Sequence, residues 1–98
     1  MQKNVLVTGA SSGIGADAVR ILVENNFHVI ATVRKSEDKE KLKQKYAAKV
    51  DVVVLDVCNF EEVEKLPEVL KNQFGIKQLY GLVNNAGVAL AGPIQFQD

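Results

Sequence analysis

The sequence contains a single cysteine and carries no net charge, and both features limit what the chain can be. One thiol, Cys58, excludes a disulfide within the chain and fits a reducing compartment. Its acidic neighbours Asp56 and Glu61 have the wrong charge to activate a thiolate, so we expect a buried structural thiol. The 12 basic and 12 acidic residues cancel, which removes long-range attraction to nucleic acid or to an anionic membrane. Any anion site must therefore be local.

Long hydrophobic runs are also missing. No apolar segment approaches the roughly 20 residues that span a bilayer, and the N-terminal segment lacks the longer apolar stretch of a secretory signal. We therefore expect a cytoplasmic protein with neither a nucleic-acid nor a membrane partner. The 98 residues, 47% of them hydrophobic, allow one domain of modest size.

Short apolar runs recur along the chain with helix-length segments between them, and this pattern predicts an α/β fold. The runs are rich in Val, Ile and Leu without clean alternation, which is typical of strands covered by helices on both faces. The predicted strands are Val5–Thr8, Phe27–Val33, Val50–Asp56 and Leu79–Asn84. Parallel strands joined by right-handed crossovers are the default for the resulting βαβαβαβ order.

The segments between the runs predict helices with recognisable ends. Ser36 is placed to cap the second helix, whose thin apolar stripe predicts an exposed position. Asn59 is placed to cap the third helix, and Gly75 is a suitable residue to end it. Pro67 lies inside the third helix, so we expect it to kink or split that helix.

The strongest motif is a glycine-rich turn between the first strand and the first helix, Thr8-Gly9-Ala10-Ser11-Ser12-Gly13-Ile14-Gly15. Such a turn forms an anion site, because backbone N–H groups and the helix dipole both face the anion. Gly9 would permit the tight turn, Gly13 would let the backbone approach a pyrophosphate, and Gly15 would let the helix pack closely. The Ser11 and Ser12 hydroxyls can add donors.

The spacing of the glycines narrows the kind of anion site. The pattern G-x-x-x-G-x-G differs from the general G-x-G-x-x-G dinucleotide motif. It also lacks the G-K-[ST] of a P-loop, which argues against ATP or GTP hydrolysis. The glycines alone leave open a turn that binds no ligand.

The turn resembles the cofactor loop of the short-chain dehydrogenase/reductase family, and two further motifs agree in order and spacing. Leu55-Asp56-Val57 follows the third strand, where the family has an aspartate that bonds the adenine amino group. Asn84-Asn85-Ala86-Gly87 ends the fourth strand and matches the family's N-N-A-G, with Asn84 mainly structural. Each motif falls at the carboxyl end of a predicted strand, where open α/β sheets bind ligands. A carboxylate at position 56 that only prepares the next helix is the alternative for that residue.

The resemblance covers nearly the whole chain and implies a Rossmann-type parallel sheet of strand order 3-2-1-4, flanked by helices. The fourth strand would form an edge of this sheet. The cofactor contacts that it implies in this sequence are Gly9, Ser11, Ser12, Gly13, Ile14, Gly15, Asp56, Val57, Asn85, Ala86 and Gly87.

The end of the second strand bears on the choice between NAD and NADP. NAD enzymes of this architecture usually carry Asp or Glu here, bonded to the ribose 2′-hydroxyl, but this sequence has Val33, then Arg34 and Lys35. Arginine can grip a 2′-phosphate bidentately, and this placement resembles the NADP-preferring members of the family. We predict NADP(H) over NAD(H), with two solvated loop cations as the alternative. The additional basic residue that many NADP-preferring relatives have in the glycine loop is missing.

The resemblance implies an oxidoreductase that moves hydride between the nicotinamide and an alcohol or ketone substrate. A tyrosine would act as general acid/base, helped by a lysine, a serine and an asparagine. Tyr46 and Tyr80 lack a lysine four residues later, so the chain has no Tyr-x-x-x-Lys. His28 is expected at the strand end opposite the ligand site, where a catalytic role is not expected.

The family places all of these catalytic groups past the position of Asp98. We therefore expect residues 1–98 to be the N-terminal NADP-binding half of a longer enzyme, inactive alone and homo-oligomeric at full length. A catalytically inert nucleotide-binding or interaction module is the alternative.

Overall fold

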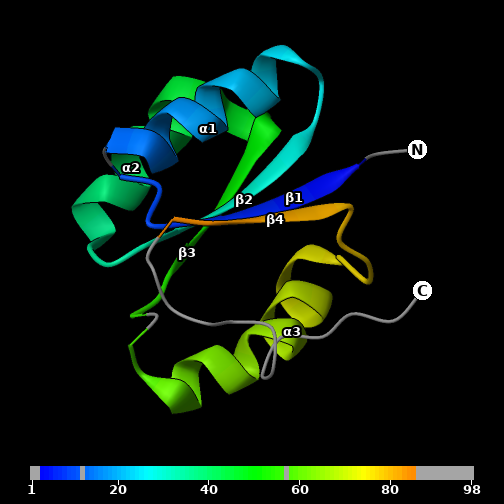
Figure 1. Cartoon of the computed structure of the whole chain (residues 1–98). Coiled ribbons are helices and arrows are strands. Elements are labelled where there is room, and N and C mark those ends of the chain that lie inside the picture. Colours follow the sequence, from blue (N-terminus) through cyan, green and yellow to red (C-terminus); the bar gives the residue numbers. More distant parts are fainter. Residues whose placement is uncertain (1–2, 12, 57, 86–98) are drawn as a thin grey trace.

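A computed structural model describes residues 3–11, 13–56 and 58–85 of the chain. One parallel sheet in the order β3-β2-β1-β4 has helices α1 and α2 on one face and α3 on the other (Figure 1). The elements are β1 (Asn4–Thr8), α1 (Gly13–Glu24), β2 (His28–Val33), α2 (Ser36–Tyr46), a 3-10 turn (Ala47–Lys49), β3 (Val50–Val54), α3 (Phe60–Phe74) and β4 (Gly81–Asn84). The predicted order of elements and of strands is confirmed.

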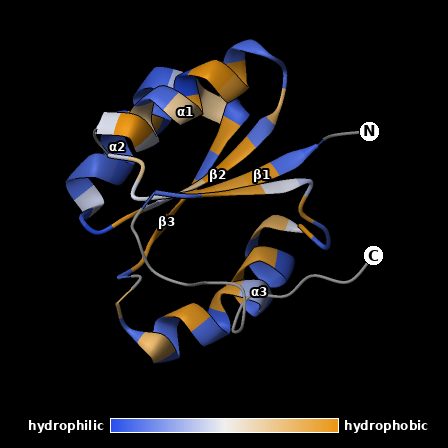
Figure 2. Cartoon of the chain, viewed as in Figure 1, coloured by the Kyte–Doolittle hydropathy of each residue, from blue (hydrophilic) through white to orange (hydrophobic). Residues whose placement is uncertain are grey.

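Side chains of the central strands alternate between two apolar layers. On one face, Leu6 and Ile30 pack with the Leu66 and Leu70 side chains of α3. On the other face, Val7 packs among residues of β2, α1 and α2. Figure 2 shows hydrophobic and hydrophilic residues interspersed along α1 and α3, whereas α2 is mostly hydrophilic. Each fully buried leucine or valine stabilises the fold by roughly 1.5–3 kcal/mol, so both layers contribute to holding the strand ends in place.

The central strands are more deeply buried than the margin of the sheet. All residues of β2 are buried, including the polar His28 and Thr32, as the mainly apolar sequence of this strand predicts. Among the described residues, β4 pairs only with β1, and Leu82 is 43% exposed. This strand forms the expected edge.

Helix α3 is capped as predicted at both ends. The Asn59 Oδ1 accepts hydrogen bonds from the backbone N–H groups of Glu61 and Glu62 at 3.1 and 3.3 Å. Gly75 ends the helix in the left-handed conformation, with φ of 68°. The helix runs unbroken through Pro67, so the expected split does not occur. Buried leucines on either side of this proline anchor both halves to the sheet.

The start of α2 differs from the prediction. Lys35 occupies the cap position and makes no side-chain cap, while Ser36 is the first helical residue. No residue of α2 is fully buried, which confirms its exposed position. Leu42 and Tyr46 supply its contact with the sheet.

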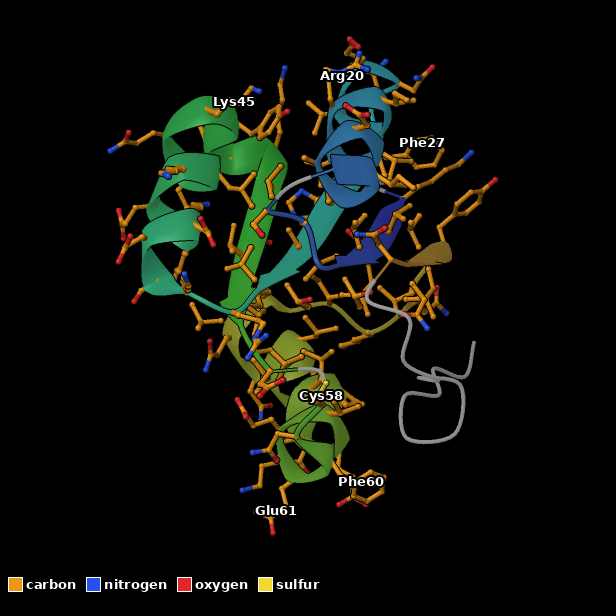
Figure 3. All side chains as sticks on the ribbon, turned by 60° about the vertical axis from the view of Figure 1, so that its left-hand side comes forward. Arg20, Phe27, Lys45, Cys58, Phe60 and Glu61 are labelled. Carbon is orange, nitrogen blue, oxygen red and sulfur yellow. The ribbon has the colours of Figure 1, made fainter. Side chains whose placement is uncertain are left out.

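Cys58 is exposed, so the expectation of a buried thiol is wrong. The backbone N–H of Cys58 donates to Asp56 Oδ1 at 2.9 Å, which forms a turn between β3 and α3 outside both apolar layers. Figure 3 shows Cys58 beside the start of α3, with Phe60 and Glu61 on its outer surface. In the described parts of the chain, no helix is both long and apolar enough to cross a bilayer.

Candidate functional site

The carboxyl ends of the strands meet at one edge of the sheet, and the predicted motifs lie there. Thr8, the last residue of β1, is in register with Asn84, the last residue of β4. The Thr8 Oγ1 donates to Asn84 Oδ1 at 3.1 Å, so the two strand ends are joined by side chains as well as by the ladder. This contact agrees with a structural role for Asn84.

The glycine turn begins directly after β1 and is tied to β2. Gly9 has φ of 63°, the left-handed conformation that glycine adopts without steric cost, which fits the tight turn predicted for it. Its backbone N–H donates to Thr32 Oγ1 at 3.3 Å, and the Ala10 N–H donates to the Thr32 carbonyl at 3.0 Å. Thr32 is 1% exposed, so water does not compete for these bonds. The turn is therefore fixed by a residue of the neighbouring strand.

Sequence reasoning did not find Thr32. It lies inside an apolar run and belongs to no motif. One sequence signal could have identified Thr32. It is the only polar residue among the last five of β2 and lies one residue before the end of that strand. A buried hydroxyl needs a hydrogen-bond partner, and the adjacent turn supplies one.

Gly15 and Asn85 hold the other side of the turn. A Cβ built on Gly15 would overlap the Gly9 carbonyl oxygen and come within 2.8 Å of Asn85 Nδ2. That amide donates to the Gly9 carbonyl at 3.1 Å. The first turn of α1 therefore packs directly against the loop, which is the close approach for which Gly15 was singled out. Asn85 joins this contact from the end of β4.

Gly13 and Ile14 form the open side of the turn. Gly13 begins α1 with φ of 62°, and a Cβ there would meet no atom within 4 Å. Glycine is thus required for conformation at this position and not for packing within the chain. Ile14 is 75% exposed. The first turn of α1 contains no acidic residue, so nothing on it opposes the positive end of the helix dipole.

A cavity of about 450 Å³ opens beside the turn and extends to the end of β2 and the start of α2. It is lined by Gly9, Ser11, Thr32, Val33, Arg34, Lys35, Asp38 and Leu55. Three of the predicted cofactor residues, Gly9, Ser11 and Arg34, are thus brought to one cavity. Asp38 is an additional lining residue that the sequence did not single out.

Asp56 and Asn85 do not line this cavity. The Asp56 carboxylate is half-buried and accepts the Cys58 N–H, so within this structure it shapes the turn that leads to α3. This is the role given as the alternative for Asp56. The remaining predicted site residues, Ser12, Val57, Ala86 and Gly87, lie outside the described residues.

His28 lies at the opposite end of β2, as expected. Its Nε2 is 2.7 Å from Asp51 Oδ2 on β3, and the imidazole is nearly buried. The pair joins two strands far from the glycine turn. In residues 3–11, 13–56 and 58–85 there is also no cluster of three or more histidine, cysteine or acidic side chains that could hold a metal ion.

The parallel sheet, the glycine turn before α1 and the cavity at the strand ends define the Rossmann class of nucleotide-binding folds. The sequence profile of the short chain dehydrogenase family matches residues 3–98, and the chain belongs to this family. The suspected resemblance is therefore confirmed.

Individual relatives agree with this assignment. The human dehydrogenase/reductase SDR family member 9 is 40% identical over 86 residues, which are 88% of this chain and 27% of that protein. The NADPH-dependent 3-dehydrocapnine reductase of Ornithobacterium rhinotracheale is 40% identical over 90 residues, 92% of this chain and 32% of the relative. The chain thus spans about a third of the length of these curated relatives.

A solved structure of ElxO with NADP bound superposes with a TM-score of 0.77 at 34% identity. The match covers 91% of this chain and 36% of that structure. The similarity therefore extends over the sheet and both helical layers.

Proposed function

We propose that this chain forms the NADP(H)-binding half of an oxidoreductase that transfers hydride between the nicotinamide and an alcohol or carbonyl carbon. One observation carries the proposal. A single cavity joins the glycine turn, at Gly9 and Ser11, to the Arg34 side chain after β2. A pyrophosphate bound at the turn and a 2′-phosphate bound by the guanidinium would then belong to one ligand. The NADPH-dependent reductase and the NADP-bound ElxO among the relatives support this cofactor.

The pyrophosphate would bind where α1 begins. The exposed first turn offers backbone N–H groups without an opposing acid, and the Ser11 hydroxyl lines the adjoining cavity. Gly13 keeps this surface free of side-chain atoms. The residues that we assign to this contact are Gly9, Ser11, Ser12, Gly13, Ile14 and Gly15.

The 2′-phosphate would bind at Arg34. Val33 offers no acceptor for a ribose hydroxyl and is almost fully buried. In the described part of the chain neither Arg34 nor Lys35 forms an ion pair, so both cations are available to an anion. Arg34 can donate two parallel hydrogen bonds to a phosphate, which makes it the stronger of the two contacts.

The adenosine and the nicotinamide ribose would meet the ends of β3 and β4. We assign Asp56 and Val57 to the adenine, and Asn85, Ala86 and Gly87 to the ribose. For Asp56 the assignment requires one carboxylate oxygen to serve the adenine while the other keeps the turn at Cys58. Leu55, directly before Asp56, adds an apolar side to the cavity.

The division of labour follows from the residues present. A bound nicotinamide would supply the hydride chemistry, while this chain binds the cofactor and fixes its position. No Tyr-x-x-x-Lys occurs in the sequence, so we assign proton transfer and substrate binding to segments of a longer protein. We expect that protein to be a homo-oligomer acting on a small alcohol or ketone.

Cofactor titration tests the proposal. Calorimetry of the 98-residue chain should give saturable NADPH binding that is tighter than NADH binding. Failure to bind either dinucleotide, or tighter binding of NADH, would contradict it.

The second candidate is an inert nucleotide-binding module, which would use the same cavity. The reading frame separates the two candidates. A serine and a Tyr-x-x-x-Lys encoded after Asp98 support the enzyme, and a stop codon there supports the module.

A further inference from the structure

The cavity that holds Arg34 also contains a carboxylate, Asp38. We infer that Asp38 is a specificity-determining residue that restrains the preference for NADP(H) and helps the site to accept NAD(H). The inference rests on the proposed function, because a cavity that binds no dinucleotide gives Asp38 nothing to discriminate.

The local backbone brings Asp38 to the cavity wall. Helix α2 begins at Ser36, and the Asp38 N–H donates to the Lys35 carbonyl at 3.1 Å. This first turn carries Asp38 back over the end of β2, into the same lining as Arg34 and Lys35. Asp38 is half-buried there, whereas Glu37, its neighbour in the same turn, is exposed and does not line the cavity.

The Asp38 carboxylate is not paired with either of its basic neighbours in the cavity lining. Among the described residues, no ion pair joins Asp38 to Arg34 or Lys35. A carboxylate in this position can accept a hydrogen bond from a ribose 2′-hydroxyl. It also repels a 2′-phosphate that Arg34 attracts. This repulsion is stronger in a partly buried cavity than in bulk water, because the effective dielectric constant is lower there.

Asp38 also replaces a group that is missing from its usual position. An acid at the end of the second strand commonly bonds the ribose 2′-hydroxyl in NAD-binding Rossmann folds. Here Val33 occupies that end and is 2% exposed. Among the described residues that line this cavity, Asp38 is the only acidic one. In this chain the acceptor for a ribose 2′-hydroxyl would therefore be Asp38, in the first turn of α2, and not a residue at the end of β2.

A competing explanation is that Asp38 only stabilises α2 through the helix dipole. Acidic residues in a first turn do so by about 0.3–1 kcal/mol, and Glu37 occupies the same turn. The two residues thus form a matched pair. Each carries one negative charge in the first turn, but only Asp38 lines the cavity.

The test compares Asp38→Asn with Glu37→Gln in the 98-residue chain. Isothermal titration would give the Kd of each variant for NADPH, NADH, 2′,5′-ADP and 5′-ADP at one fixed salt concentration. The two ADP isomers isolate the 2′-phosphate from the nicotinamide. Circular dichroism and urea unfolding would verify that both variants keep the fold.

We expect Asp38→Asn to tighten NADPH and 2′,5′-ADP by about three- to tenfold and to leave NADH equal or weaker. Glu37→Gln should shift the ratio of NADPH to NADH affinity by less than about twofold. An unchanged ratio in Asp38→Asn, or an equal shift in both variants, would overturn the inference while the proposed function stands. Absence of all dinucleotide binding in the unmodified chain would instead overturn the proposed function, and this inference with it.

Discussion

The side-chain amide of Asn85 donates a hydrogen bond of 3.1 Å to the backbone carbonyl of Gly9. This bond joins the end of β4 to the turn that follows β1, next to the position where α1 packs against the same carbonyl. Gly9 is thus held from both sides, by Asn85 through its carbonyl and by Thr32 through its N–H. Substitutions at these contacts should therefore affect both the fold and the proposed cofactor site.

Asn85→Ala should loosen the glycine turn. The partly buried Gly9 carbonyl would lose its side-chain donor, at a cost of about 1 kcal/mol in the free energy of unfolding. NADPH affinity should fall with it, because the turn would no longer be held in one conformation. Urea unfolding and NADPH titration would measure both effects. Asn25→Ala removes an exposed helix-end bond far from the turn and serves as control; equal NADPH affinities in the two variants would contradict the prediction.

Gly15→Ala should be poorly tolerated. The new methyl group would overlap the Gly9 carbonyl oxygen, which is backbone and can move only if the turn moves. We expect a loss of about 1–3 kcal/mol of stability. Gly81→Ala is the matched control, since its Cβ would lie 4.0 Å from a Val5 methyl group, an ordinary van der Waals contact. Thermal unfolding would measure the stability of both variants. Similar losses of stability would contradict the prediction that close packing requires glycine at position 15.

Thr32→Val should weaken the turn while preserving the shape of β2. Valine keeps the branched side chain but removes the oxygen that accepts the Gly9 N–H. We expect a cost of about 1–2 kcal/mol in unfolding free energy and weaker NADPH binding. Thr32→Ser retains the hydroxyl and should recover the NADPH affinity. If serine and valine behave alike in the titration, the hydroxyl does not position the turn.

Arg34→Ala should reduce NADPH affinity about tenfold or more and leave NADH affinity nearly unchanged. A charge-assisted bond to a phosphate contributes about 1.5–3 kcal/mol, and NADH has no phosphate at this position. Calorimetric titration with both dinucleotides measures the effect. Arg20→Ala is the control, because Arg20 pairs with Glu24 on the outer surface of α1. An NADPH preference that survives the loss of Arg34 would contradict the proposed cofactor contact.

Asp51→Asn should affect stability but not the cofactor site. The His28 Nε2 lies 2.7 Å from Asp51 Oδ2 at the end of the sheet opposite the glycine turn. Loss of the charged partner of a nearly buried imidazole should cost about 1 kcal/mol. Urea unfolding would report this cost, and NADPH titration should give an unchanged Kd. A large change in that Kd would show that the two ends of the sheet are coupled.

Local patterns in the sequence were enough to predict much of this arrangement. The order of the elements follows from the alternation of apolar runs and helices, whereas the strand order was implied by the resemblance to the short-chain dehydrogenase/reductase family. The roles of Gly9 and Gly15 follow from where a glycine falls between a strand and a helix. The Asn59 cap and the Gly75 stop are equally local, since each depends on a few neighbouring residues.

Residues whose roles depend on distant partners were not predicted. Thr32 acts on a turn 23 residues away, and the apolar periodicity of β2 gives no sign of that hydrogen bond. Asp38 looks like an ordinary acid at a helix start until β2 and α2 are placed around one cavity. Cys58 is exposed although cysteines are usually buried, because the turn made by Asp56 carries the thiol outward.

The two anchors of the glycine turn differ greatly in sequence separation, with consequences for synthesis on a ribosome. Thr32 follows Gly9 by 23 residues, but Asn85 follows it by 76. Contacts between distant residues form late, because a long loop must close first. A nascent chain can therefore form the tie between β1 and β2 early, but it cannot complete the turn until β4 has emerged and docked. The glycine turn, although it lies near the start of the sequence, is therefore among the last of the described features to gain all of its hydrogen bonds.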